Sequence, residues 1–392
     1  MDPQSMPTIP AAEYPQRWAR VQAMMAAQGL DLLIAYADDR ATFGAAHARW
    51  LADFPVHFEP ACVLVPGEGD PVMLCGPESD QYALLSGRIP DVRVLYEFTH
   101  PDEDYPYATI QRLVEVIGDV VPRPERVRCV GVAGGSLMGA EVRDAFRQAL
   151  DVQWGDAEAA MCNLRAIKSP AEIAVMRYAY HLAEVGLDAA VEAVRVGAPE
   201  RAVAAEAEAA MRRAGAEGTG IDTIVASGPN ARPILARSTL RPIAADELVL
   251  LTVAPRYEGY HGAIGRPVLV GAPGAEVRRA VDVAIEAQQA CYGAMRPGVE
   301  GRAVERAGRQ VVEEAGLGAY FLYSGLHSVG AIEFEPPIFG PSSDARLEAG
   351  MVVSVDIPMF NAPWGGLRVE DGFLITEDGA ERLNETPFLI RR

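Results

Sequence analysis

The stretch Ser324-Gly-Leu-His-Ser-Val-Gly-Ala-Ile-Glu-Phe-Glu-Pro-Pro337 sets one histidine, His327, between two glycines and places two carboxylates, Glu333 and Glu335, behind it. Glycine lets a backbone approach a ligand closely, so a histidine in this setting is a candidate site residue. A histidine that is merely hydrogen-bonded in a turn is the plain alternative. The double proline is expected to stop regular structure, because proline has no amide donor.

Composition limits what the chain can be. Its 392 residues exceed the usual size of one domain, which predicts two domains. Hydrophobic residues make up 49% and charged residues 23%, as in ordinary globular proteins. Acidic residues outnumber basic ones 54 to 35, and no dense Lys/Arg run is present. Nucleic acid and anionic membrane surfaces are therefore not expected partners.

The cysteines and the N-terminal segment indicate a location. Five cysteines are scattered without CxxC spacing, which predicts neither a disulfide framework nor a structural zinc site. The first ten residues lack the basic and apolar regions of a secretory leader. No run approaches the roughly 18 apolar residues of a membrane span. We therefore expect a cytoplasmic protein.

Residues 1–160 predict a small α/β domain, because short apolar strands alternate with amphipathic helices. Helical spacing of Trp18, Val21 and Met25 predicts a helix over 15–29 that ends at Gly29. The other expected elements are strands at 31–36, 61–65, 71–75, 92–96 and 128–132, and helices near 107–120 and 136–150.

Residues 161–392 predict an α+β domain. Ser169, Pro170 and Glu172 form the pattern of a capping box, which predicts the start of a long helix. Helices are expected over 170–195, 199–214, 275–295 and 301–315, and strands over 222–226, 248–253, 259–270, 351–358 and 369–376. Each half of the domain has two helices followed by paired strands. This order favours an antiparallel sheet covered by helices on one face.

Several ordered motifs resemble one family. Besides the opening stretch they are Arg165-Ala-Ile-Lys-Ser-Pro-Ala-Glu-Ile173, Ala226-Ser-Gly-Pro-Asn230, Tyr257-Glu-Gly-Tyr260, Gly350-Met-Val-Val-Ser-Val-Asp356 and Arg368-Val-Glu-Asp371. In this order and spacing, over residues 165–380, they resemble the prolidase, aminopeptidase P, methionine aminopeptidase and creatinase clan. The resemblance implies a pita-bread fold for residues 161–392 and a creatinase/prolidase-like domain over residues 1–160. It also implies a homodimer.

The resemblance implies five metal ligands, of which this chain keeps three. Metal-dependent members hold two divalent ions with two aspartates, a histidine and two glutamates. These fall, in order, on Thr252, Ala263, His327, Asp356 and Glu370. Hard divalent ions need several oxygen ligands, so we expect no metal cofactor. A single divalent ion at His327, Asp356 and Glu370 is the alternative.

Creatinase resembles this chain in having lost the metal set. The resemblance therefore implies a metal-independent hydrolase that cleaves a C–N bond, an amide or amidine, in a small molecule. Creatine itself is not expected, because the catalytic histidine's place falls near Leu235, a substrate-gripping glutamate falls on Gly265, and the substrate-binding arginine has no match near Phe58. The family's other active-site histidine falls on Phe334.

The expected catalytic residues are two histidines and two carboxylates. If position 263 faces the cleft, His261 should face it too, because residues two apart on a strand share a face. We expect His327 and His261 to carry protons, and Glu370 and Asp356 to orient water or hold a cationic group. A carboxylate beside His327 would raise the pKa of the imidazole. For Glu370 the plain alternative is a surface ion pair with Arg368.

Six further residues are predicted to contact the substrate: Thr252, Tyr260, Arg266, Glu335, Phe334 and Trp364. Their plain alternatives are internal hydrogen bonds for the polar residues and packing for the aromatic ones. Glu333 is expected to face solvent.

Two other functions stay open from the sequence. One is a metal-dependent Xaa-Pro aminopeptidase or dipeptidase on the same fold. The other is a non-catalytic protein that binds a peptide or metabolite in the same cleft.

Overall fold

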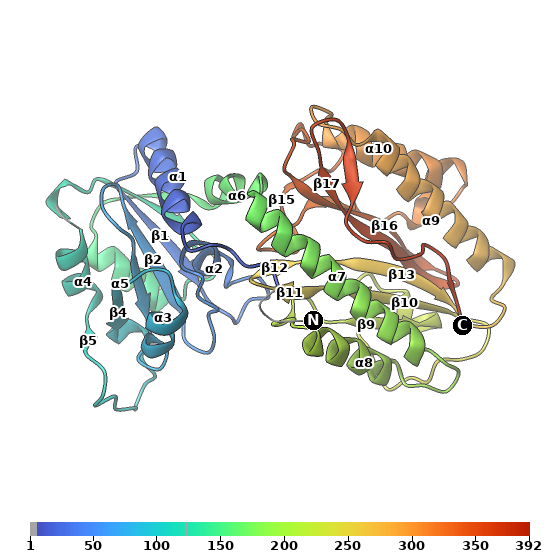
Figure 1. The fold of residues 1–392 in the computed structure, drawn as a ribbon, viewed down its shortest axis with the longest axis horizontal. Coiled ribbons are helices and arrows are strands. Elements are labelled where there is room, and N and C mark those ends of the chain that lie inside the picture. Colours follow the sequence, from blue (N-terminus) through green and yellow to red (C-terminus); the bar gives the residue numbers. More distant parts are fainter. Residues whose placement is uncertain (1–5, 122–123) are drawn as a thin grey trace. The chain divides into compact units, whose positions relative to one another are not determined.

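The computed structural model describes residues 6–121 and 124–392 and divides the chain into two compact units (Figure 1). One unit is Ile9–Arg165, and the other is Ala166–Arg392 with the N-terminal residues up to Thr8. The sequence placed the domain boundary a few residues earlier, after residue 160. Residues 1–5 of the N-terminal segment lie outside the described residues, so the expectation of no leader is not addressed there.

The unit Ile9–Arg165 holds a seven-stranded mixed sheet in the order β5-β4-β3-β2-β1-β6-β7. The central strand β1 is buried along its whole length, as its apolar run predicts, and pairs antiparallel with β2 and parallel with β6. The strands are β1 Leu32–Ala37, β2 Ala61–Pro66, β3 Val72–Cys75, β4 Val92–Leu95, β5 Ile110–Gln111, β6 Cys129–Ala133 and β7 Gln153–Asp156.

The helices of this unit are α1 Glu13–Gln28, α2 Ala46–Ala52, α3 Asp80–Ser86, α4 Leu113–Val120, α5 Ala140–Ala149 and α6 Glu158–Ala166, with 3₁₀ turns η2 Tyr96–Phe98 and η3 Pro124–Arg126. Helix α1 ends at Gly29 in the left-handed conformation, as predicted. The helix expected over 107–120 begins only at Leu113, because the short strand β5 occupies the residues before it. The predicted α/β architecture is confirmed.

In the second unit the capping box forms as predicted. The Ser169 hydroxyl accepts a hydrogen bond from the Glu172 amide (3.1 Å), and the Glu172 carboxylate accepts one from the Ser169 amide (2.7 Å). The helices are α7 Pro170–Ala193, α8 Glu200–Arg213, α9 Ala275–Ala294 and α10 Gly301–Glu314, with 3₁₀ turns η4 Gly228–Ala231 and η5 Gly318–Tyr320. None of the described helices of the chain is both long and apolar enough to cross a membrane.

The large sheet of this unit runs in the order β15-β14-β16-β17-β13-β10-β9, with β18 beside β17 and β19 beside β13. In Figure 1, α9 lies beside β16 and β17, while α7 lies beside β10 and α8 beside β9. The strands are β9 Ile224–Ser227, β10 Leu248–Val253, β13 Ile264–Leu269, β14 Leu326–Ser328, β15 Glu335–Ile338, β16 Val352–Ala362, β17 Gly365–Ile375, β18 Ala380–Arg382 and β19 Ile390–Arg391. The α+β architecture is therefore confirmed.

Two local expectations are wrong. The double proline does not stop regular structure, because β15 includes Pro336 and Pro337. It can do so because β15 is an edge strand, where a missing amide donor costs least. The strand expected over 259–270 is split into β12, Tyr260–His261, and β13. Strand β12 belongs to a separate three-stranded sheet with β8, Gly218–Thr219, and β11, Pro255–Tyr257.

The five cysteines are all free thiols in the structure. Four of them are buried, and burial raises the pKa of Cys291 to about 12.

Candidate functional site

Four neighbouring strands of the large sheet place one residue each in a single row. Thr252 on β10 is opposite Gly265 on β13, which is opposite Glu370 on β17, which is opposite Asp356 on β16. Directly opposite residues on adjacent strands lie on the same face. The antiparallel register therefore brings together residues that are more than one hundred positions apart in the sequence.

His327 reaches this row from β14, where it pairs with Ser354 of β16. The Ser354 hydroxyl donates to Glu370 Oε1 at 3.0 Å. The His327 ring is buried, and its Nδ1 lies 3.0 Å from the carbonyl of Ser328. A carbonyl can only accept, so Nδ1 carries the hydrogen and the lone pair of the neutral ring is on Nε2. This tautomer leaves Nε2 able to bind a metal ion.

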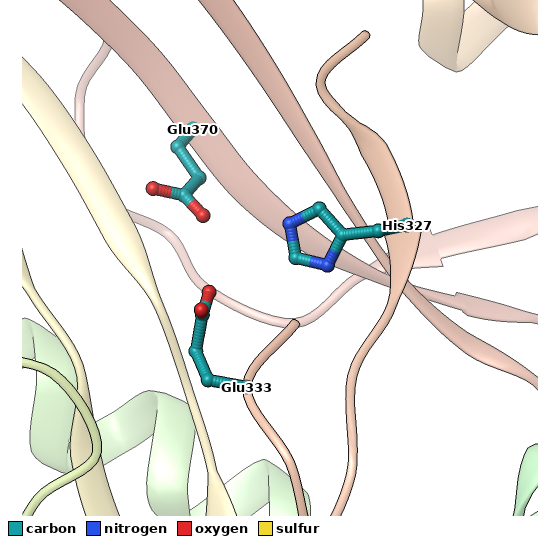
Figure 2. A group of neighbouring side chains, drawn as sticks. All are labelled: His327, Glu333 and Glu370. Carbon is teal, nitrogen blue, oxygen red and sulfur yellow. The ribbon is translucent and has the colours of Figure 1, made fainter. Parts of the chain in front are cut away.

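The structure gathers His327, Glu333 and Glu370 into one group whose ligand atoms all lie within 4.8 Å of one another. Figure 2 shows the two carboxylates and the imidazole pointing into a common space. All three side chains are buried. A histidine with two carboxylates is a ligand set that zinc and manganese accept.

The expectation that Glu333 faces solvent is wrong, because its side chain is buried and the residue is only 6% exposed. Burial, and after it the nearby Glu370, raise the pKa of its carboxyl to about 8, although Arg368 opposes the shift. The loop between β14 and β15 folds it back toward His327. The only signal in the sequence was an acidic residue flanked by the apolar Ile332 and Phe334, which does not by itself separate a site residue from a surface one.

Arg368 lies at the other end of the site and is buried, so the alternative of a surface ion pair with Glu370 does not apply. It is 7% exposed, and its Nε lies 3.0 Å from Asp356 Oδ2. Its Nη2 donates to the Tyr323 hydroxyl at 2.7 Å, and Nη1 lies 3.5 Å from Thr252 Oγ1. Tyr323 in turn donates a short hydrogen bond to Asp356. Burial lowers the pKa of Arg368, but Asp356, Tyr323 and Glu370 together raise it above its ordinary value, so the guanidinium stays charged.

The single-ion alternative from the sequence needs one correction. Asp356 is engaged by Arg368 and Tyr323, and Glu333 is the residue that joins His327 and Glu370. Burial raises the pKa of Asp356, and the guanidinium opposes this shift. The donor group therefore has Glu333 where the sequence analysis expected Asp356.

The described residues do not fit the two-ion set of the family. Thr252 offers only a hydroxyl that contacts Arg368, and the buried Ala263 has no side-chain donor. They fit one ion, because His327, Glu333 and Glu370 supply the three protein ligands that are usual for a catalytic zinc.

The pKa of His327 is lowered, whereas the sequence predicted that a neighbouring carboxylate would raise it. Burial lowers it below its ordinary value, and Glu370 and Asp356 only partly oppose this. The imidazole is thus held neutral, the form that binds a metal.

His261 does not follow the argument that placed it in the cleft. It lies on β12, whereas Ala263 falls between β12 and β13, so strand alternation does not join the two residues. Its Nδ1 donates to the carbonyl of Gly330 at 3.0 Å, and burial lowers its pKa to about 4. A proton-carrying role for His261 stays a prediction.

Two of the predicted substrate contacts are engaged inside the protein. The Tyr260 hydroxyl donates to Glu172 at 2.5 Å. Glu335 is fully buried and pairs with Lys168, whose Nζ lies 3.3 Å from its carboxylate. These contacts match the structural alternatives given for both residues.

Arg266 is likewise engaged internally. It is fully buried, pairs with Asp371 at 2.5 Å, and donates to the carbonyl oxygens of Gly265, Glu370 and Pro387. This set uses the guanidinium within the sheet, which weighs against the predicted substrate contact.

Two aromatic residues lie differently. The Phe334 ring is 44% exposed and its centroid is 4.4 Å from that of the His327 ring, so it borders the donor group on the solvent side. Trp364 is half-buried and packs edge-on against Tyr320, with ring centroids 6.2 Å apart.

Known proteins are similar to this chain in sequence. The profile of metallopeptidase family M24 matches residues 174–377, about half of the chain. An Xaa-Pro dipeptidase of Pyrococcus furiosus is 29% identical over 74% of this chain and 82% of its own length. An Xaa-Pro dipeptidase of Lactobacillus delbrueckii subsp. lactis is 30% identical over 62% of this chain and 68% of its own length.

Solved structures are similar in fold. The prolidase of Pyrococcus horikoshii OT3 covers 95% of this chain and 99% of its own, with a TM-score of 0.82 and 22% identity. An Xaa-Pro dipeptidase from Bacillus anthracis covers 97% of this chain and 100% of its own, also with a TM-score of 0.82, at 23% identity. They confirm the prolidase-like, pita-bread fold predicted from the motifs.

These relatives overturn two expectations. The predicted creatinase-like, metal-independent hydrolase of amides or amidines is wrong, because the matching family is one of metallopeptidases and the relatives are Xaa-Pro dipeptidases. The expectation of no metal cofactor is wrong for the same reason. The lack of the two aspartates predicts no metal, but His327, Glu333 and Glu370 form a different donor set. A non-catalytic binder also lacks support, because the expectation of an enzyme is confirmed.

The matched profile, the identity to curated relatives and the shared fold agree. The chain is a hydrolase of carbon–nitrogen bonds that belongs to metallopeptidase family M24.

Proposed function

We propose that this protein is a divalent-metal-dependent peptidase that cleaves Xaa-Pro dipeptides. Membership of a metallopeptidase family and the names of its relatives support the reaction class. The observation that carries the proposal is the buried group of His327, Glu333 and Glu370, with its ligand atoms within 4.8 Å of one another.

A bound divalent ion would act as a Lewis acid on the scissile carbonyl. The chain's own residues prepare the place for it. His327 presents Nε2 because Nδ1 is held by the Ser328 carbonyl, and the Ser354 hydroxyl orients the carboxylate of Glu370. The exposed ring of Phe334 beside His327 offers an apolar surface to a proline ring.

The test is hydrolysis by the full-length protein, stripped with a chelator and reloaded separately with Mn²⁺, Co²⁺ or Zn²⁺. Ala-Pro and Met-Pro are the substrates, and Ala-Ala is the control for proline selectivity. We expect free proline to be released from the Xaa-Pro substrates, and the release to stop when chelator is added.

Matched variants separate the site from the background. Glu370→Gln removes a charge from the donor group and should abolish turnover, whereas Glu348→Gln changes an exposed carboxylate and should leave it intact. No release of proline with any of the three metals would reject the proposal. Equal turnover of Ala-Ala would reject the proline specificity alone.

A homodimer and a cytoplasmic location are part of the same proposal. The family resemblance supports the dimer, and the free cysteines agree with a reducing compartment. Light scattering after size-exclusion chromatography should give twice the chain mass of 42.0 kDa. The mass of a single chain would reject the dimer.

A further inference from the structure

We infer that the site binds one divalent ion per chain, through His327, Glu333 and Glu370, and that the guanidinium of Arg368 occupies the place of a second ion. The inference deepens the proposed function and rests on its metal dependence.

A missing side chain gives Arg368 its position. A Cβ built on Gly265 would lie 2.7 Å from both Cγ and Cδ of Arg368, closer than any side chain tolerates. Gly265 therefore leaves the space through which the arginine stem crosses β13. The stem carries the guanidinium to Thr252 on one side and Asp356 on the other. Thr252 is the position at which the family has its first aspartate ligand.

The two ends of the site differ in charge. Asp356 has a guanidinium at 3.0 Å, whereas among residues 6–121 and 124–392 the only cation at ion-pair distance from Glu370 is Arg368, with Nη1 at 3.9 Å, and Glu333 has none. Within the described part of the chain, Glu370 Oε2 and Asp356 Oδ1 are both buried without a hydrogen-bond partner, but only Asp356 has its other oxygen on the guanidinium and the Tyr323 hydroxyl. When all three carboxylates are ionised, their charge exceeds that of the one guanidinium by two, which is the charge of one divalent ion. A buried carboxylate of this kind needs a cation or strong donors.

A second ion is disfavoured for two reasons. Thr252 and Ala263 provide no carboxylate at the positions where the family has its aspartates. The guanidinium already lies against Asp356, and a cation placed beside it would be repelled at short range inside a buried site.

The experiment is a count of bound ions in the full-length protein. Isothermal titration with Mn²⁺ and with Zn²⁺, followed by elemental analysis after desalting, should give one ion per chain. The paramagnetic resonance spectrum of the Mn²⁺ form should be that of an isolated ion. Two ions per chain, an exchange-coupled spectrum or no binding would each overturn the inference.

The ligand assignment is tested by three variants. Glu333→Gln should weaken the binding of the divalent ion by about 100-fold or more. This exceeds the effect usual for a residue that only hydrogen-bonds to a metal ligand. Asp356→Asn should still bind one ion, because Asp356 pairs with Arg368. The control Glu348→Gln, at an exposed carboxylate, should bind as the unaltered protein does. Wild-type affinity in Glu333→Gln would overturn the assignment.

Two checks keep these outcomes interpretable. Circular dichroism and thermal unfolding of the metal-free variants show whether Glu333→Gln is folded, and the ion count of the unaltered protein stands whether or not a variant folds. The inference and the proposed function can also fail separately. One bound ion without proline release would reject only the peptidase, whereas two bound ions with release would reject only the single-ion site.

Discussion

Glu370 and Asp371 are consecutive residues of β17 whose side chains lie on opposite faces of the sheet. Their carboxylates are both buried but differ in the number of hydrogen-bond and ion-pair partners. Asp371 pairs with Arg266 at 2.5 Å and also accepts from Gln288 at 2.6 Å. Arg382 and Asn384 donate to it as well. Glu370 accepts one hydrogen bond, from Ser354, and within the described residues its Oε2 has none. Both carboxylates are buried.

The difference separates a structural charge from a functional one. A buried carboxylate whose two oxygens both accept hydrogen bonds, as those of Asp371 do, stabilises a single arrangement of strands, and removal of its partner is costly. A buried carboxylate with an open lone pair costs free energy until a cation arrives. The face with Asp371 therefore holds β17 in place, and the face with Glu370 is prepared for an ion.

The largest effect, a loss of stability, is expected on the face of β17 that carries Asp371. Arg266→Met leaves Asp371 without its main cation and should lower the free energy of unfolding by about 3–5 kcal/mol. Urea unfolding of the metal-free protein measures it. The control Arg302→Met breaks an exposed pair with Glu300 and should cost less than about 1 kcal/mol. Equal losses in the two variants would contradict the distinction.

His261 is a buried side chain that, unlike the two carboxylates, is neutral in the folded chain. Its pKa is about 4 in the folded chain against 6.5 ordinarily, so between these values the unfolded chain binds a proton that the folded chain does not. Stability should therefore fall as pH drops from 6.5 to 4, by about 3 kcal/mol from this group. His261→Asn should flatten this slope in unfolding curves measured with chelator present. An unchanged slope would show that other groups cause it.

On the face of β17 that carries Glu370, the substitution Glu370→Gln should lower the affinity for Mn²⁺ by about 100-fold or more. The metal-free variant should unfold at the same denaturant concentration as the unaltered protein or at a higher one, because a buried charge has been removed. Titration calorimetry and urea unfolding check the two parts. Destabilisation as large as that of Arg266→Met would place Glu370 with the structural charges.

The smallest effect is expected from Ser354→Ala, which removes the hydroxyl that orients Glu370. Metal affinity should fall by about tenfold, the low end for a group that supports a ligand. Ser328→Ala, at a buried hydroxyl on the same strand as His327, is the matched control and should change affinity less. The reverse order would show that the hydrogen bond to Glu370 does not matter.

The sequence determined those features that depend on local pattern. Helix α7 begins at Ser169 because its capping box satisfies amides within a few residues, and β10 matches its predicted range because a continuous apolar run needs burial on both faces. Ordered motifs gave the prolidase-like fold, since an arrangement of motifs survives when individual ligands change. His327 and Glu370 were found in the same way, and the structure places both in the donor group.

Only the tertiary structure decided which charges meet. Glu333 became a candidate ligand because a loop turns it toward His327, and Asp356 did not because Arg368, whose stem lies against Gly265, pairs with it. Such pairings depend on register between strands that are far apart in the chain, and on the space that one glycine leaves. Hydrogen bonding and ion pairing act over a few ångströms in space, so a one-dimensional pattern carries little information about them.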